Sequence, residues 1–135
     1  MRTTRKLALL AAGLIGGALL NVVPAAPASA TVYCNIEMVY QNAFVPGNDG
    51  TFTPNCLLGQ GAVNNGVASL QDALKTCYRK NISIDSNFGP QTKAALVAVQ
   101  SSLHITADGV YGPQSARAMS HPIVSGGGAC KRITF

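Results

Sequence analysis

Tryptophan is absent from the 135 residues, and aromatic side chains make up only 6% of them. Charged residues are also scarce, at 11%, and beyond residue 30 the seven basic residues are scattered along the chain rather than gathered in one stretch. Phosphate contacts dominate the affinity of proteins for nucleic acids, so a chain without a dense basic surface is not expected to bind DNA or RNA.

The sequence also lacks the motifs of common hydrolases and metalloenzymes. It contains no GxSxG and no HExxH, and His104 and His121 are the only histidines. A typical catalytic zinc site uses three protein ligands, so two histidines are too few unless carboxylates join them. Both histidines are expected at the surface or at helix ends. The glycine run after Ser125 predicts a flexible loop, because a nucleophile elbow needs a strand before it and a helix after it. We therefore expect no enzyme activity, no cofactor and no metal.

The first thirty residues follow the order of a secretory signal peptide. Arg2, Arg5 and Lys6 form a positive start, residues 7–20 form an apolar run, and Ala-Ser-Ala at 28–30 is a small-residue cleavage site. The run is shorter than the roughly 20 residues that cross a bilayer. We predict that this segment is removed and that the remaining chain is secreted, extracellular or associated with a cell wall, without membrane contact.

Removal of residues 1–30 changes the charge of the protein. The ten basic residues fall to seven, against five acidic residues, so the formal net charge falls from +5 to +2. Residues 31–135 are enough for one domain with a modest core, and we expect a monomer.

Four cysteines remain in the exported part, and none of them forms a CxxC pair. An even number of cysteines in an exported chain predicts two disulfides rather than a metal site. Three pairings are open from the sequence. We favour Cys34–Cys56, which would staple the N-terminal segment to itself, and Cys77–Cys130, which would tie the end of a helix to the C-terminal tail.

Residues 31–62 are expected to be irregular. The stretch VYCNIEMVYQ has some strand character, and FVPGNDGTFTPNC contains Pro-Gly and Asp-Gly turn signals that favour a small hairpin. Helical spacing begins at Val67, because Val67, Leu70 and Leu74 fall on one face together with Cys77 or Tyr78. Asn64 or Asn65 is expected to cap this helix, and residues 79–81 to end it.

A short pattern then occurs twice, as DSNFGPQT from Asp85 and as DGVYGPQS from Asp108. We call residues 85–92 the first turn and residues 108–115 the second turn. Each proline stands where a helix begins, a position in which the missing N–H has no intrahelical partner to lose. The pattern predicts one helix over 90–103 and a shorter one ending near Ser120, since Pro122 disfavours helix at the residue before it.

Two interpretations of the repeated turn stay open. In the first it is purely architectural, with Phe88 and Tyr111 filling the gap between helices and the glycines adopting backbone angles closed to other residues. In the second its polar groups line a binding site. The residues for which the second interpretation is stronger are Gln91, Thr92, Tyr111, Gln114 and Ser115, whose polar groups we expect at exposed helix starts.

Taken together, four stretches resemble the peptidoglycan-binding domain of the type-1 family. That family pairs a first helix of the form V..LQ..L with two Asp-Gly-x-aromatic/aliphatic-Gly-Pro-x-Thr turns, each opening a helix. The matching stretches are VASLQDAL, IDSNFGPQT, VAVQSSLHI and ADGVYGPQS. The resemblance implies a mainly α fold, a small three-helix bundle over 63–121. An irregular, stapled extension over 31–62 and a tied-back tail over 122–135 would complete the protein.

The resemblance further implies a non-catalytic module whose shallow groove holds the glycan and stem peptide of peptidoglycan. Ser86 departs from the family pattern, which usually has Gly there, so the second turn is the better candidate for ligand contact. The expected ligand-binding residues are Asp108, Gly109, Val110, Tyr111, Gln114 and Arg117, together with Gln91, Thr92 and Lys93. We expect the Tyr111 ring to stack on a sugar, and Gln114 and Arg117 to share a helix face that suits a carboxylate.

The aspartates of the two turns, Asp85 and Asp108, are expected to brace their turns more than to touch ligand. Two other functions are alternatives. A small stapled inhibitor or effector could use the same scaffold to bind a protein, and this is the main alternative. A wall hydrolase would need catalytic residues that the chain does not offer.

Overall fold

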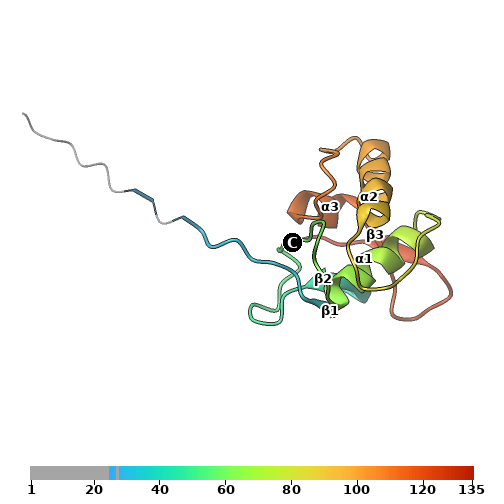
Figure 1. Ribbon diagram of the computed structural model, residues 1–135. Helices are drawn as coiled ribbons and strands as arrows, with labels where there is room; N and C mark the ends of the chain where they lie inside the picture. The colour runs from blue at the N-terminus through green and yellow to red at the C-terminus, as the bar shows by residue number, and fades with distance from the viewer. Residues whose placement is uncertain (1–24, 27) are drawn as a thin grey trace, which may run out of the picture.

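A computed structural model describes residues 25–26 and 28–135 (Figure 1). Most of the predicted signal peptide therefore lies outside the described residues. These residues form three helices, α1 (Asn65–Thr76), α2 (Pro90–Ser102) and α3 (Pro113–Ala118). Four short strands accompany them, β1 (Ile36–Tyr40), β2 (Ala43–Gly47), β3 (Ser120–Pro122) and β4 (Cys130–Arg132). The predicted mainly α, three-helix fold is confirmed. No helix of the described part is long and apolar enough to cross a membrane.

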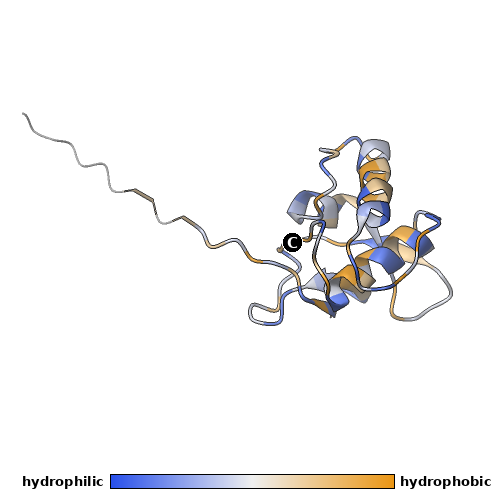
Figure 2. Cartoon of the chain, in the orientation of Figure 1, coloured by the Kyte–Doolittle hydropathy of each residue, from blue (hydrophilic) through white to orange (hydrophobic). Residues whose placement is uncertain are grey.

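The helices begin where the sequence predicts. The side-chain oxygen of Asn64 accepts a hydrogen bond from the Val67 N–H at 3.1 Å and so caps α1. Helices α2 and α3 both begin at a proline that follows a glycine in extended backbone. Figure 2 shows hydrophobic and hydrophilic residues alternating around α1, as expected for a helix with one buried face.

Two helices end earlier than expected. Helix α1 stops at Thr76 rather than at 79–81, because the chain turns away at Arg79, whose φ of 54° is left-handed. Helix α3 stops at Ala118 rather than near Ser120, because Met119 is extended, with ψ 152°, and leads directly into β3.

An antiparallel bridge between Asn48 and Thr53 closes the predicted Asp-Gly turn, and a longer hairpin precedes it in the chain. Strands β1 and β2 pair antiparallel from Ile36 opposite Gly47 to Tyr40 opposite Ala43. Gln41 and Asn42 form the turn between them, with left-handed φ angles of 50° and 62°. Two consecutive left-handed residues give the tight turn that suits strand twist, although neither of them is glycine here.

The C-terminal tail returns to the rest of the fold as a strand. Strands β3 and β4 pair antiparallel, with Ser120 opposite Arg132 and Pro122 opposite Cys130. A bridge between Ala43 and Ile123 connects this pair to β2. The glycine loop over 126–128 has three left-handed φ angles in succession, which only glycine adopts freely.

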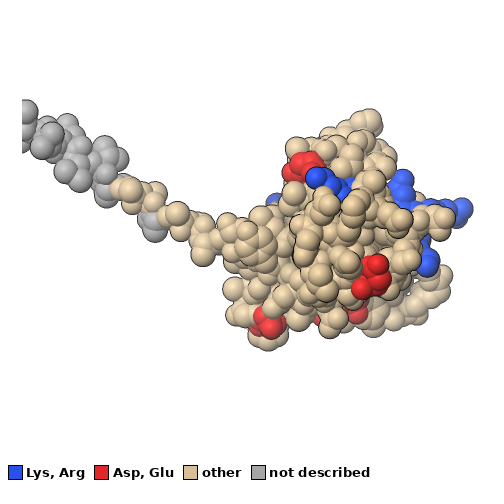
Figure 3. Space-filling view, viewed as in Figure 1, with Lys and Arg blue, Asp and Glu red and all other residues tan. Residues whose placement is uncertain are grey.

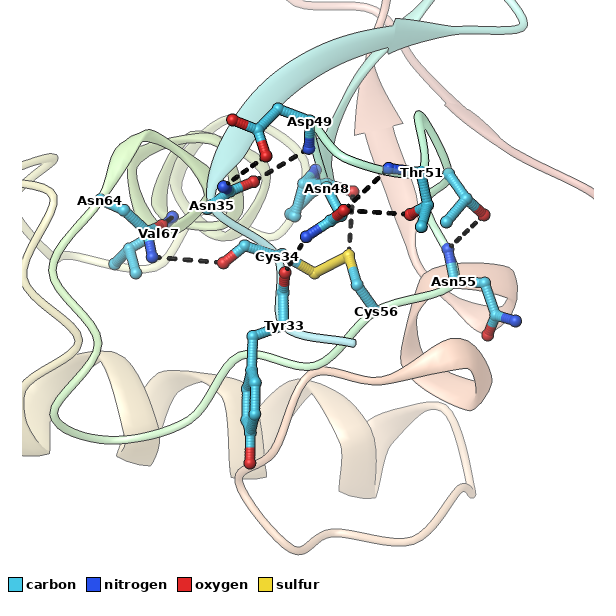
Figure 4. Close-up of a disulfide and its surroundings, with 12 residues drawn as sticks. Tyr33, Cys34, Asn35, Asn48, Asp49, Thr51, Asn55, Cys56, Asn64 and Val67 are labelled. Atoms are coloured by element: carbon cyan, nitrogen blue, oxygen red, sulfur yellow. Dashed lines mark hydrogen bonds between the residues drawn. A yellow bond between two sulfur atoms is a disulfide. The ribbon is translucent and has the colours of Figure 1, made fainter. Parts of the chain in front are cut away.

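Both favoured disulfides are confirmed, Cys34–Cys56 and Cys77–Cys130. Cys34 and Cys56 are 1% and 2% exposed, and they belong to the same buried cluster as the apolar residues of α1 and α2. The cluster also contains Leu58 from the extension (Figure 4 shows the disulfide and its neighbours). The extension therefore contributes to the main core instead of lying outside it.

Removing either disulfide should destabilise the protein according to the length of the loop it closes. The bonds span 22 and 53 residues. Loop-closure entropy then predicts that Cys34→Ala/Cys56→Ala loses about 3 kcal/mol of the free energy of unfolding, and Cys77→Ala/Cys130→Ala about 4 kcal/mol. Urea denaturation followed by circular dichroism measures both. An unchanged midpoint for the second pair would show that the tail is held without its disulfide.

Candidate functional site

The first turn is held by the buried side chain of Gln71 on α1, which is 1% exposed. Its amide oxygen accepts hydrogen bonds from the N–H groups of Asp85 and Ser86, both at 3.0 Å. Its amide nitrogen lies 2.8 Å from Asp85 Oδ1 and 3.0 Å from both the Asn87 carbonyl oxygen and Thr92 Oγ1. A single amide thus joins α1 to the turn and to the start of α2.

The second turn is held in the same way by Gln100 on α2, also 1% exposed. Its amide oxygen accepts from the Gly109 N–H at 2.9 Å. Its amide nitrogen contacts Asp108 Oδ1 at 3.1 Å, the Val110 carbonyl oxygen at 2.9 Å and Ser115 Oγ at 3.0 Å. The repeated sequence is therefore a repeated hydrogen-bond network, in which each helix holds the turn that opens the next.

The aspartates brace the turns, as the sequence predicted. Asp85 Oδ1 accepts from the Asn87 N–H at 3.0 Å, and Asp108 Oδ1 accepts from the Val110 N–H at 2.9 Å. The Asn87 N–H, followed by the Gln71 amide, holds the pKa of the Asp85 carboxyl below its ordinary value of 3.8. This carboxylate is therefore charged at neutral pH.

Ser86 occupies the left-handed conformation that the second turn gives to a glycine. Its φ is 62°, and that of Gly109 is 70°. The first turn thus keeps the same bend although it has Ser86 in place of the glycine of the family pattern. This difference therefore gives no reason to prefer the second turn as the ligand site.

The aromatic residues of the two turns face the interior. Phe88 and Tyr111 are both 0% exposed. Their main chains pair with the segment before α1, since Phe88 exchanges hydrogen bonds with residues 61 and 62, and Tyr111 pairs with Leu58. The expectation that the Tyr111 ring is free to stack on a sugar is wrong, because that ring fills the core. Its hydroxyl is buried as well, and burial raises its pKa.

The other predicted ligand residues divide into buried and exposed groups. Thr92 and Ser115 are each 3% exposed and serve the glutamine networks, so the expectation of accessible hydroxyls there is wrong. Gly109 is also buried, and a Cβ there would lie 2.7 Å from Cγ of the exposed Lys93 side chain. The exposed residues are Gln91, Lys93, Asp108, Val110, Gln114 and Arg117.

Arg117 is exposed but already has partners within the chain. Its Nε donates to the main-chain oxygen of Phe135 at 2.9 Å, and its guanidinium carbon lies 4.4 Å from the centre of the Phe135 ring. The guanidinium therefore contacts the C-terminal tail.

A hollow of about 400 Å³ lies at the first turn. We call it the first-turn hollow, and its lining consists of Gln71, Ile82, Ser83, Asp85, Asn87, Gly89, Pro90, Gln91 and Thr92. Ser83, Asp85, Asn87 and Gln91 are exposed. The hollow therefore offers a carboxylate, two side-chain amides and a hydroxyl at its surface. Figure 3 shows charged side chains interspersed among uncharged surface on the face that it draws.

The histidines lie in different environments. His104 is exposed and has a left-handed φ of 55° just after α2, as expected for a residue at a helix end. His121 is fully buried, contrary to expectation, and its Nε2 lies 3.1 Å from the Ala116 carbonyl oxygen. Burial lowers the pKa of His121 to about 4. Among the described residues, no three His, Cys, Asp or Glu side chains are grouped to hold a metal ion.

Fold and turn geometry together define a small helical domain in which buried glutamines hold paired helix-opening turns. Residues 63–119 match the family described as "Putative peptidoglycan binding domain". Similar solved structures include a 2.05 Å crystal structure of a peptidoglycan-binding protein from Clostridioides difficile in complex with glutamine hydroxamate, 33% identical over 45% of this chain and 38% of that chain, with a TM-score of 0.43. The SleB N-terminal domain is 30% identical over 45% of this chain and 84% of that chain, with a TM-score of 0.43. No curated protein matches the chain.

The chain therefore belongs to the peptidoglycan-binding domain family through residues 63–119. The part it shares with the Clostridioides difficile protein is well under half of that protein's length.

Replacing Gln71 should destabilise the fold, whereas replacing the exposed Gln91 should not. Gln71→Leu removes the acceptor of two turn N–H groups and the partner of Thr92, and each buried group left unsatisfied costs about 1–3 kcal/mol. We expect a loss of about 3 kcal/mol in the free energy of unfolding. Gln91→Leu, the matched control, should stay within about 0.5 kcal/mol. Equal losses in urea denaturation would contradict the role given to Gln71.

Proposed function

We propose that the protein is an extracytoplasmic, non-catalytic module that binds peptidoglycan through the first-turn hollow. The observation that carries the proposal is a polar hollow of about 400 Å³ within the family segment, framed by the start of α2. The side chains of Ser83, Asn87 and Gln91 make no hydrogen bond within the Gln71 network, so they remain available to a ligand.

The chemistry of the hollow suits a stem peptide. The amides of Asn87 and Gln91 and the hydroxyl of Ser83 both donate and accept hydrogen bonds, and the Asp85 carboxylate, whose Oδ1 is taken by the turn, adds a negative charge. A stem peptide presents amide groups of both polarities, as well as amino and carboxyl groups. Fixed polar groups around a small concave surface are what orient such a ligand.

The location proposed for the protein, secreted and cell-wall associated, agrees with its covalent structure. Two disulfides close loops in a chain whose described residues leave no cysteine free. Such bonds persist in oxidising compartments outside the cytoplasm, where peptidoglycan also lies.

Binding to insoluble cell walls tests the proposal. Asn87→Ala/Gln91→Ala should weaken co-sedimentation by about 1–3 kcal/mol, the sum of two or more hydrogen bonds lost at the hollow. The matched control is Gln114→Ala, which alters the residue equivalent to Gln91 at the second turn and should sediment like the parent. If Gln114→Ala loses binding instead, the second turn is the site. A parent protein that stays in the supernatant would favour the alternative, a stapled inhibitor or effector that binds a protein.

We also expect that the protein leaves the wall intact. The matched family segment is a binding domain, and His121 is enclosed in the core with its Nε2 facing the Ala116 carbonyl oxygen. Turbidity of a wall suspension should follow the buffer control over hours. Clearance that persists through repurification and is abolished by a point substitution in this chain would refute the non-catalytic assignment.

A further inference from the structure

A second hollow lies on the N-terminal extension and differs in chemistry from the first. Its volume is about 270 Å³, and its lining consists of Tyr33, Cys34, Leu57, Leu58, Gly59, Gln60, Ala62 and Asn64. All but Asn64 belong to the extension, residues 31–62. We call it the Tyr33 hollow. None of its lining residues carries a charge.

Tyr33 is an exposed aromatic residue on a rigid backbone. Its side chain is 65% exposed, although its main chain pairs with Leu57. The Asn48 amide donates to the Tyr33 carbonyl oxygen at 2.7 Å, and a disulfide joins Cys34, which follows Tyr33, to Cys56, which precedes Leu57. Figure 4 shows the ring directed away from the disulfide. The fold thus holds a large apolar ring in water, where it stabilises no core.

The amides at this hollow have different roles. Asn64 is fixed, because its oxygen caps α1 and its nitrogen donates to the Cys34 carbonyl oxygen at 3.2 Å. Gln60 is exposed, in the loop before α1. Tyr33 and Gln60 therefore offer a ring face and an amide beside one shallow hollow.

We propose that the Tyr33 hollow is a saccharide subsite that takes a neutral, N-acetylated pyranose of the glycan strand. One face of a pyranose is made of C–H groups, which pack against an aromatic ring, while its hydroxyl and acetamido groups suit a side-chain amide. The Tyr33 main chain is already held, and an aromatic ring has only two rotatable side-chain bonds to order, so binding costs little conformational entropy here.

The absence of charge in this lining favours the glycan over the stem peptide. Carboxylates and amino groups would be desolvated in this hollow without a charged partner, which is unfavourable. The first-turn hollow, in contrast, contains the ionised Asp85. The inference rests on the proposed function for its ligand class, but it concerns residues outside the matched segment 63–119, apart from Asn64 at its start.

A glycan without stem peptides tests this subsite separately. The probe is the β-1,4-linked tetrasaccharide of N-acetylglucosamine, titrated into the exported protein and followed by ¹H–¹⁵N NMR. We expect shifts to concentrate at Tyr33, Gly59 and Gln60. Tyr33→Ala should weaken the affinity about fivefold or more, as expected for loss of one aromatic contact, whereas Tyr33→Phe should retain most of it.

The matched control is Phe52→Ala, which removes another exposed aromatic ring of the extension, 74% exposed and outside the lining of the hollow. It should bind like the parent, and the thermal midpoints of all variants should agree. The proposal is overturned if the tetrasaccharide does not bind, if Tyr33→Ala binds it like the parent, or if the shifts concentrate at the first turn.

Those outcomes are independent of the wall assay. Sedimentation with walls in the absence of tetrasaccharide binding would overturn the saccharide subsite and leave the proposed function standing. Tetrasaccharide binding at Tyr33 without any effect of Asn87→Ala/Gln91→Ala on wall binding would instead overturn the first-turn hollow as the wall site.

Discussion

The fold depends on two buried amides. Gln71 and Gln100 each place a polar group in the core, where it would be costly if unpaired, and each is fully paired with the turn that begins the next helix. In both networks the amide oxygen accepts from main-chain N–H groups of the turn, and the amide nitrogen contacts the hydroxyl of Thr92 or Ser115. Helix α2 therefore cannot move relative to α1 without breaking the first network, and α3 is held to α2 by the second.

The N-terminal extension compensates for the small size of this helical unit. Helix α3 has only six residues, and three short helices enclose little apolar area. The extension adds Cys34, Cys56 and Leu58 to the main buried cluster, and its hairpin forms a second cluster with Ile133 of the tail. Both disulfides reduce the entropy of the unfolded chain, Cys34–Cys56 within the extension and Cys77–Cys130 between the end of α1 and the tail. The stapled segments are thus part of the domain's core.

The sequence predicted the features that depend on residue type and on near neighbours in the chain. Proline after glycine marked the starts of α2 and α3, the Asn64 cap marked α1, and the cysteine count gave the disulfides. Which way a turn residue faces is a tertiary property, and there the prediction failed. Tyr111 and Thr92 are buried because the segment before α1 and the Gln71 amide cover them. The recurrence of Gln in VASLQDAL and VAVQSSL was a usable signal, although Gln71 precedes Asp85 by 14 residues and Gln100 precedes Asp108 by only 8.

Whether a turn residue is buried or exposed also decides whether its side chain can contact a ligand. Within each turn, the aspartate, the main-chain N–H groups and the hydroxyl are used by the glutamine network, so conservative changes there alter folding before they alter binding. Recognition is left to side chains that the network does not use, which at the first turn are Ser83, Asn87 and Gln91. These groups are few and polar, and a single such hollow would bind weakly. The helical unit offers no turn aromatic for an apolar contact, because Phe88 and Tyr111 are both enclosed in the core, whereas Tyr33 on the extension, the proposed saccharide contact, is exposed.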